Sequence, residues 1–176
     1  MLASFSTVRF SIRLFPAMPC RLFLVEDQEL VRSAMHAYFS AADDLEVVGE
    51  AVTVGAAIAT LNDHHRDDVL PDVLITDLAL PDASGLELIE HVRRAEWPVG
   101  CLVLSGRSES RYVEAARRAG ADGYVLKGNP NTYLAAVRSV ATGDAYCSDR
   151  LQAAWDRASE QPPDPRHAGE SGHDAS

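Results

Sequence analysis

The chain has 176 residues, of which 47% are hydrophobic and 24% are charged, and its formal net charge is -10. That length suits one globular domain. The negative net charge repels nucleic acid, and the sequence shows no segregated cluster of basic residues that would overcome this repulsion. No run of about 18 apolar residues is present to span a membrane. The three cysteines are odd in number and far apart in sequence, so they support neither a zinc site nor a disulfide framework. Reduced cysteines fit a cytoplasmic protein.

Residues 1–19 precede the first regular element. They contain Arg9, Arg13 and several serines but no acidic residue, a composition that resembles a transit peptide. The alternative is a start site assigned too early, with Met18 as the true first residue. We favour this alternative, and otherwise expect residues 1–19 to be a disordered extension.

From residue 20 on, short apolar runs alternate with segments whose apolar residues recur at helical spacing. The first run, at residues 21–25, predicts a buried strand, and residues 28–41 predict the helix that follows it. The same alternation continues along the chain, with strands predicted at 45–52, 72–77, 99–104 and 122–126, and helices at 54–61, 85–95, 109–119 and 131–141.

Five strands that alternate with five helices predict parallel pairing through right-handed crossovers. The strands read as continuous apolar runs, which indicates that helices cover both faces of the sheet. The predicted fold is therefore α/β, an open three-layer sandwich. In such sheets the functional site lies at the carboxyl ends of the strands.

The regular pattern weakens towards the end of the chain. We expect one domain at residues 20–145, an extra helix within residues 146–160, and a disordered acidic tail at residues 161–176. The tail contains no apolar residue other than alanine, so it cannot bury enough surface to offset its ordering entropy.

Polar residues stand where four of the predicted strands end: Glu26 and Asp27, Asp77, Ser105, and Lys127. Each alone is a common turn or capping residue, but together they would meet in one crevice, where three carboxylates repel one another. A divalent cation and the lysine would compensate, and oxygen ligands favour Mg²⁺. The chemistry that follows is phosphoryl transfer to Asp77, with Lys127 and Ser105 contacting the phosphoryl group.

The order of these residues resembles the receiver domain of two-component response regulators. The resemblance covers about residues 21–144 and is closest to receivers of the NarL/FixJ subfamily. Its most specific parts are Asp77-Leu-Ala-Leu-Pro81 and Tyr124-Val-Leu-Lys127. The resemblance implies a flavodoxin-like (βα)5 fold, with the five parallel strands in the order 2-1-3-4-5.

The resemblance also implies a role for each matched residue. Glu26 and Asp27 would hold Mg²⁺, together with Asp77 and the backbone carbonyl of Ala79. Asp77 would be the phosphoacceptor.

Three further positions match the family. Ser105 would be the switch hydroxyl, Tyr124 the aromatic switch residue, and Lys127 the phosphate-binding lysine. Gly128 departs from the pattern, because many receivers have proline there, but glycine tolerates unusual backbone angles.

The partners that the resemblance implies are a sensor histidine kinase or a phosphotransfer protein as the donor, and an unknown downstream protein. The fourth helix, the fifth strand and the fifth helix would form the face that this protein recognises, and a homodimer is a further option. Relatives usually continue into a helix-turn-helix domain. The residues after 145 are too few for one, so we expect a stand-alone receiver that does not bind DNA directly.

Two other functions stay open. A degenerate receiver could act as a phosphorylation-independent scaffold, although such chains normally lose the acids or the lysine, which are all present here. A Mg²⁺-dependent phosphatase of the haloacid dehalogenase type would need a second acid two residues after Asp77, where this chain has Ala79. We therefore expect a signalling switch and not an enzyme.

Overall fold

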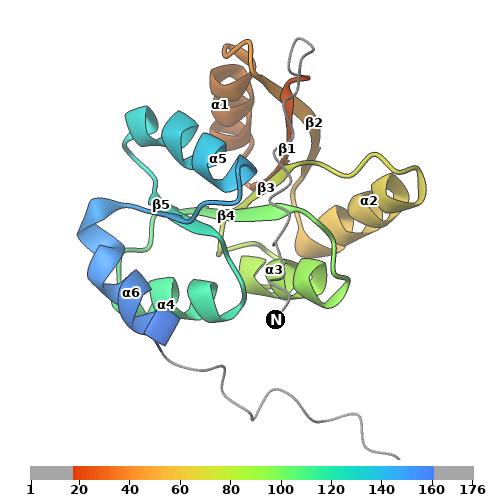
Figure 1. Cartoon of the computed structure of the whole chain (residues 1–176). Coiled ribbons are helices and arrows are strands. Elements are labelled where there is room, and N and C mark those ends of the chain that lie inside the picture. Colours follow the sequence, from red (N-terminus) through yellow and green to blue (C-terminus); the bar gives the residue numbers. More distant parts are fainter. Residues whose placement is uncertain (1–17, 161–176) are drawn as a thin grey trace, which may run out of the picture.

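The computed structural model describes residues 18–160, which form a parallel sheet between two layers of helices (Figure 1). The strands are β1 Cys20–Val25, β2 Leu45–Ala51, β3 Val73–Thr76, β4 Gly100–Ser105, β5 Gly123–Leu126 and β6 Tyr146–Cys147. The α-helices are α1 Glu29–Ser40, α2 Val54–Arg66, α3 Gly85–Arg94, α4 Ser110–Arg118, α5 Tyr133–Ala141 and α6 Gln152–Glu160. Two short 3-10 helices are η1 Pro130–Thr132 and η2 Asp149–Leu151.

The strand order is β2-β1-β3-β4-β5-β6, and all neighbouring strands pair in parallel. The predicted flavodoxin-like order 2-1-3-4-5 is thus confirmed, and a sixth strand extends the sheet beyond β5. The strand order reverses at β1, which lies between β2 and β3. Such a switch point opens a crevice at the carboxyl ends of the strands.

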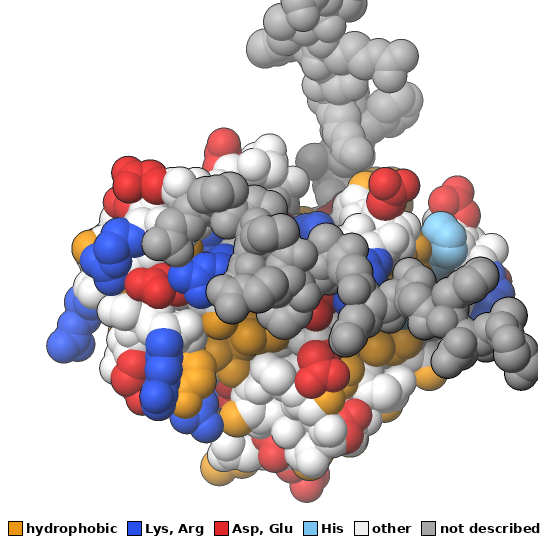
Figure 2. Space-filling view, turned by 90° about the horizontal axis from the view of Figure 1, so that it is seen from below, with side chains coloured by type: hydrophobic (Ala, Val, Ile, Leu, Met, Phe, Trp, Pro, Cys, Tyr) orange, Lys and Arg blue, Asp and Glu red, His pale blue; other side chains and the backbone are white. Residues whose placement is uncertain are grey.

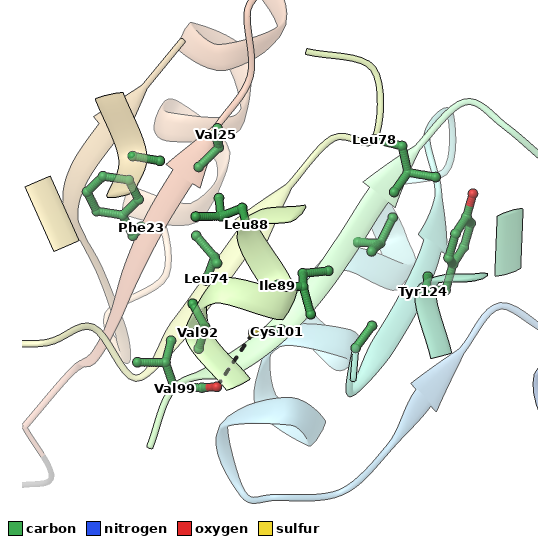
Figure 3. Packing of buried hydrophobic residues seen from close by; sticks show 14 of the residues in the cluster. Phe23, Val25, Leu74, Leu78, Leu88, Ile89, Val92, Val99, Cys101 and Tyr124 are labelled. Carbon is green, nitrogen blue, oxygen red and sulfur yellow. Dashed lines mark hydrogen bonds between the residues drawn. The ribbon is translucent and has the colours of Figure 1, made fainter. Parts of the chain in front are cut away.

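The two helical layers enclose separate apolar cores. Helices α1 and α5 cover one face of the sheet, whereas α2, α3 and α4 cover the other (Figure 1). On the second face, Leu88, Ile89 and Val92 of α3 lie against the sheet near Leu74 and Cys101 (Figure 3). Three- and four-residue spacing puts these α3 positions on one side of the helix. The core thereby fixes the loop that joins β3 to α3, which carries the candidate site.

Helix α2 is longer than the sequence predicts. The predicted helix spans residues 54–61, whereas α2 continues to Arg66. The added residues are polar, but His64 packs its ring edge-on against Phe23, with 6.0 Å between the ring centroids. His65 likewise lies against Trp97, with 5.4 Å between the ring centroids. Two aromatic contacts with the core therefore sustain a turn that apolar periodicity alone does not reveal.

Residues 146–160 contain more than the helix that the sequence predicts there. Strand β6 comes first, with Tyr146 beside Gly123 and Cys147 beside Tyr124. Helix α6 follows and lies against α4 (Figure 1). A two-residue strand leaves no periodic pattern, so β6 had no signal in the sequence.

Residues 1–17 and 161–176 lie outside the described residues. The predicted extension and the predicted acidic tail fall almost entirely within these two ranges. Between residues 18 and 160, no helix combines the length and the apolar character needed to cross a membrane.

Substituting alanine for Gly85, the first residue of α3, should strongly destabilise the domain. A Cβ atom at this position would lie 2.0 Å from the carbonyl oxygen of Asp77 and 2.8 Å from the hydroxyl oxygen of Thr76. We expect Gly85→Ala to lower the free energy of unfolding by about 3 kcal/mol, measured by urea denaturation. Gly106→Ala is the control, because no atom lies within 4 Å of a Cβ there. Equal denaturation midpoints for the two variants would contradict the prediction.

Candidate functional site

The centre of the candidate site is the ammonium group of Lys127, which contacts two carboxylates. Its Nζ donates hydrogen bonds to Oε2 of Glu26 at 2.5 Å and to Oδ2 of Asp77 at 2.7 Å. Glu26 is 1% exposed and Asp77 is 7% exposed, so both carboxylates are buried. Buried charges are tolerated only when they are paired in this way.

The sheet register brings these residues together although they are far apart in sequence. Backbone hydrogen bonds continue one residue beyond the strands: Glu26 N donates to the carbonyl oxygen of Ala51 at 3.1 Å, and Asp77 N donates to that of Val25 at 3.1 Å. On the other side of the crevice, Lys127 N donates to the carbonyl oxygen of Ser105 at 2.9 Å. Backbone hydrogen bonds of the sheet therefore set the position of each residue, independently of its side-chain contacts.

Asp77 is held by both of its carboxylate oxygens. Oδ1 accepts a hydrogen bond from the backbone N–H of Leu78 at 2.6 Å, and Oδ2 accepts the bond from Lys127. These two bonds select one side-chain orientation, in which the carboxylate lies at the end of β3. A carboxylate oriented in this way is prepared for attack on an electrophile, provided that the ammonium moves to the incoming group.

The charge state of Lys127 follows from this pairing. Burial alone would lower its pKa, but hydrogen bonds from Lys127 to Asp77 and Glu26, together with their negative charges, raise the pKa above the usual lysine value. Lys127 therefore keeps its proton at neutral pH. One ammonium offsets one of the two carboxylates, so the buried cluster retains one negative charge.

Asp27, the third predicted acid, does not join this cluster. Its side chain is exposed, and it forms no ion pair within residues 18–160. No group of three or more His, Cys, Asp or Glu side chains in that part of the chain is arranged to hold a metal ion. The donor chemistry nevertheless fits Mg²⁺, because the cluster offers only carboxylate oxygens and an excess of negative charge. Ala79 lies in the loop after β3, where it bridges to Ser84 and is exposed.

The two predicted switch residues share one partner, the backbone of Arg107. Ser105 Oγ accepts a hydrogen bond from Arg107 N at 3.4 Å, and the hydroxyl of the buried Tyr124 donates to the carbonyl oxygen of Arg107 at 2.8 Å. Burial is the main reason that the pKa of Tyr124 is raised. The loop between β4 and α4 is thus tied to Ser105 and Tyr124 at the same residue.

Two residues near the site were not identified from the sequence. Nη1 of Arg32 donates to the carbonyl oxygen of Glu26 at 2.9 Å, which steadies the acidic turn after β1. The carboxylate of Asp82 accepts from the backbone N–H groups of Val54 and Gly55 at 2.9 and 2.8 Å, and these bonds lower its pKa. Asp82 therefore caps α2 from the loop that follows Asp77. Its only sequence signal is its place in a turn-forming stretch.

An apolar groove opens beside Lys127, between α1 and α5. Its volume is about 440 Å³, and its lining includes Val31, Tyr38 and Tyr133. Leu30 stands at the same groove and is 84% exposed. An exposed leucine next to an apolar groove is typical of a surface that binds another protein.

Comparison with protein families gives one result that covers most of the chain. The model described as the response regulator receiver domain matches residues 22–138. The chain is 35% identical over 135 residues to the DNA-binding transcriptional activator DevR/DosR of Mycobacterium tuberculosis, and 34% identical over 133 residues to the transcriptional regulatory protein DesR of Bacillus subtilis. These alignments cover 76% and 74% of this chain but 60% and 62% of the relatives. The chain therefore spans about three fifths of the length of these curated relatives.

Solved structures agree with this result. A two-component response regulator of the LuxR family from Aurantimonas sp. SI85-9A1 superposes with a TM-score of 0.72 at 25% identity, covering 81% of this chain and 99% of that one. The signal receiver domain of the putative response regulator NarL from Mycobacterium tuberculosis gives a TM-score of 0.66 at 28% identity, with 72% and 98% covered.

Replacing Lys127 by methionine should destabilise the protein, because Glu26 and Asp77 would then be buried without a counter-charge. We expect Lys127→Met to lower the free energy of unfolding by about 3 kcal/mol, measured by urea denaturation. Adding Asp77→Asn should recover part of that loss, because it removes one of the two unpaired charges.

Arg138→Met provides a matched control for this measurement. Arg138 forms two hydrogen bonds with Asp44, at 2.8 and 2.9 Å, but both side chains are about half exposed. Losing an exposed pair should cost much less than losing a buried one, because water screens its charges. If Lys127→Met lowered the free energy of unfolding no more than Arg138→Met does, the prediction that Lys127 stabilises the two buried carboxylates would be wrong.

Proposed function

The chain belongs to the response regulator receiver domain family, and from this premise we propose that Asp77 accepts a phosphoryl group from a sensor histidine kinase or a phosphotransfer protein. The observation that carries the proposal is the contact of Lys127 with both Asp77 and Glu26 at the carboxyl edge of the sheet. The family takes part in two-component signalling, in which phosphorylation of the receiver is the signal.

The transfer step requires little from the protein beyond orientation and charge. A carboxylate oxygen of Asp77 attacks phosphorus, and the bond from phosphorus to the donor's histidine nitrogen breaks. Lys127 then exchanges its bond with Asp77 for one with a phosphoryl oxygen, while the hydroxyl of Ser105 donates to another. The position of Lys127 at 2.7 Å from Asp77 supports this exchange.

We assign Mg²⁺ to the same edge of the sheet. Glu26, Asp27, Asp77 and the backbone carbonyl of Ala79 would hold it. The ion would neutralise charge on the phosphoryl oxygens, which one lysine cannot do alone. The excess negative charge of the Glu26–Asp77–Lys127 cluster supports the assignment.

The donor protein is assigned to the groove between α1 and α5. The groove reaches Lys127, so a protein bound there would hold its phosphorylated histidine near Asp77. Its apolar lining and the exposed Leu30 suit an apolar helix face.

We assign the binding of the downstream protein to the face formed by α4, β5 and α5. Phosphorylation would change which protein this face binds. Ser105 and Tyr124 support this assignment because both bind the backbone of Arg107, which lies just before α4.

A scaffold without phosphorylation is less well supported, because the acids and the lysine are retained, and Lys127 pairs with Glu26 and Asp77. A haloacid dehalogenase phosphatase is also less well supported, because Ala79 supplies no general acid. Steady-state hydrolysis of a phosphate monoester would distinguish such an enzyme from a receiver.

Asp77→Asn should abolish phosphorylation by acetyl phosphate, because an amide oxygen is a poor nucleophile and cannot form the acyl phosphate. Labelling of the unmodified chain is measured by intact mass and should disappear when EDTA removes Mg²⁺. Asp63→Asn is the control, since Asp63 is exposed and its carboxylate pairs with Arg66 at 2.6 Å, away from the site. Undiminished labelling of Asp77→Asn would refute the assignment of the acceptor.

A further inference from the structure

The chain covers part of its own output face. Residues 146–160, the C-terminal segment, place β6 on the outer edge of β5 and α6 against α4 (Figure 1). Figure 2 views the side of the molecule on which α4 and α6 lie, and basic, acidic and hydrophobic side chains are interspersed there. A protein that binds the α4 and β5 surface must therefore displace this segment or bind beside it.

The contact between α6 and α4 has one aromatic anchor. Trp155 is 3% exposed, and the guanidinium of Arg117 in α4 lies 4.8 Å from the centroid of its ring. Nε of Arg117 also donates to Oγ of Ser159 at 3.1 Å, and Arg157 pairs with Glu114 at 3.4 Å. An apolar anchor flanked by a hydrogen bond and an ion pair is how an amphipathic helix binds a surface of another protein.

The contact between β6 and β5 lies next to the phosphorylation site. Ser148 N donates to the carbonyl oxygen of Tyr124 at 3.0 Å, and Ser148 Oγ accepts from Leu126 N at 3.2 Å. Leu126 directly precedes Lys127. A cavity of about 220 Å³ separates η2 from the loop after β4 and is lined by Ser108, Leu126, Arg150 and Leu151. The loop that carries Arg107 and Ser108 thus has room to move toward the C-terminal segment.

We propose that α6 is an intramolecular ligand of the α4 and β5 surface, and that phosphorylation of Asp77 releases it. The freed surface then binds an amphipathic helix of a partner protein that presents an aromatic side chain where Trp155 lies. This inference rests on the proposed phosphorylation of Asp77 and adds what the output face recognises.

The route from Asp77 to α6 is a chain of contacts. A phosphoryl group on Asp77 draws the hydroxyl of Ser105, which disturbs the bond that Ser105 accepts from Arg107 N. Arg107 is tied to α4, because its Nη1 donates to the hydroxyl of Tyr112 at 2.9 Å. A shift of this loop therefore moves α4 against Trp155.

Release of α6 has a measurable consequence for its structure. A helix of nine residues is not stable alone in water, so α6 depends on its contact with α4. Once released, it loses helical hydrogen bonds and its amides exchange with solvent faster.

The first experiment follows α6 in the full chain. The sequence has two tryptophans, so Trp97→Phe leaves Trp155 as the only one. Treatment with acetyl phosphate and Mg²⁺ should shift the Trp155 emission to longer wavelength and speed hydrogen exchange in residues 152–160. The same treatment should change neither property in an Asp77→Asn chain. Intact mass on the same samples reports the extent of labelling, so full labelling with unchanged emission and exchange would overturn the inference while leaving the acceptor assignment intact.

The second experiment does not depend on phosphorylation. A labelled peptide of residues 146–160 should bind a Trp155→Ala chain at least 10-fold more tightly than the unmodified chain, whose surface α6 already occupies. Gln152→Ala, at an exposed position of α6, is the control and should behave like the unmodified chain. Equal binding to the unmodified and Trp155→Ala chains would overturn the inference. Should Trp155→Ala fail to fold, the exchange measurement on the unmodified chain decides the matter, because it needs no substitution.

Discussion

Two buried carboxylates that share one ammonium are the constraint on which the rest of this site depends. Glu26, Asp77 and Lys127 come from the ends of three different strands, so their contact exists only if the sheet forms in the observed register. Two carboxylates that face a single ammonium leave a surplus of one negative charge. The surplus of negative charge suits a cation, and under the proposed function the cation would offset the charge of the incoming, anionic phosphoryl group.

The backbone of Arg107 links this charged cluster to the rest of the molecule. Ser105 and Tyr124 reach it from neighbouring strands, and its side chain contacts Tyr112 in α4. A change at Asp77 therefore has a short path to a helix on the protein surface. The C-terminal segment lies at the end of that path, so Asp77, the loop after β4, α4 and α6 lie along one series of contacts.

The sequence was informative wherever side-chain identity determines structure. The apolar runs predicted β1 to β5. Of the polar residues that follow these strands, Glu26, Asp77 and Lys127 meet as predicted, whereas Asp27 does not. Other features do not follow from the type of side chain at a single position. The hydrogen bonds of Arg107 are made by its backbone carbonyl and N–H, which do not depend on its side chain. Strand β6 is too short for a pattern, and His64 and His65 extend α2 through contacts with Phe23 and Trp97. Which of Glu26 and Asp27 turns inward depends on the geometry of the turn after β1, which neighbouring residue types do not specify.

The two-residue strand β6 also changes what the border of the sheet offers to other chains. A longer terminal strand would present a row of unpaired N–H and C=O groups, to which a foreign strand could add. Here β5 is paired with Tyr146 and Cys147, and the chain then turns away into η2. So short a border is a poor template for strand addition or for aggregation through the sheet. Recognition on this side of the protein is thereby left to helices, whose side chains can discriminate between partners more finely than exposed backbone can.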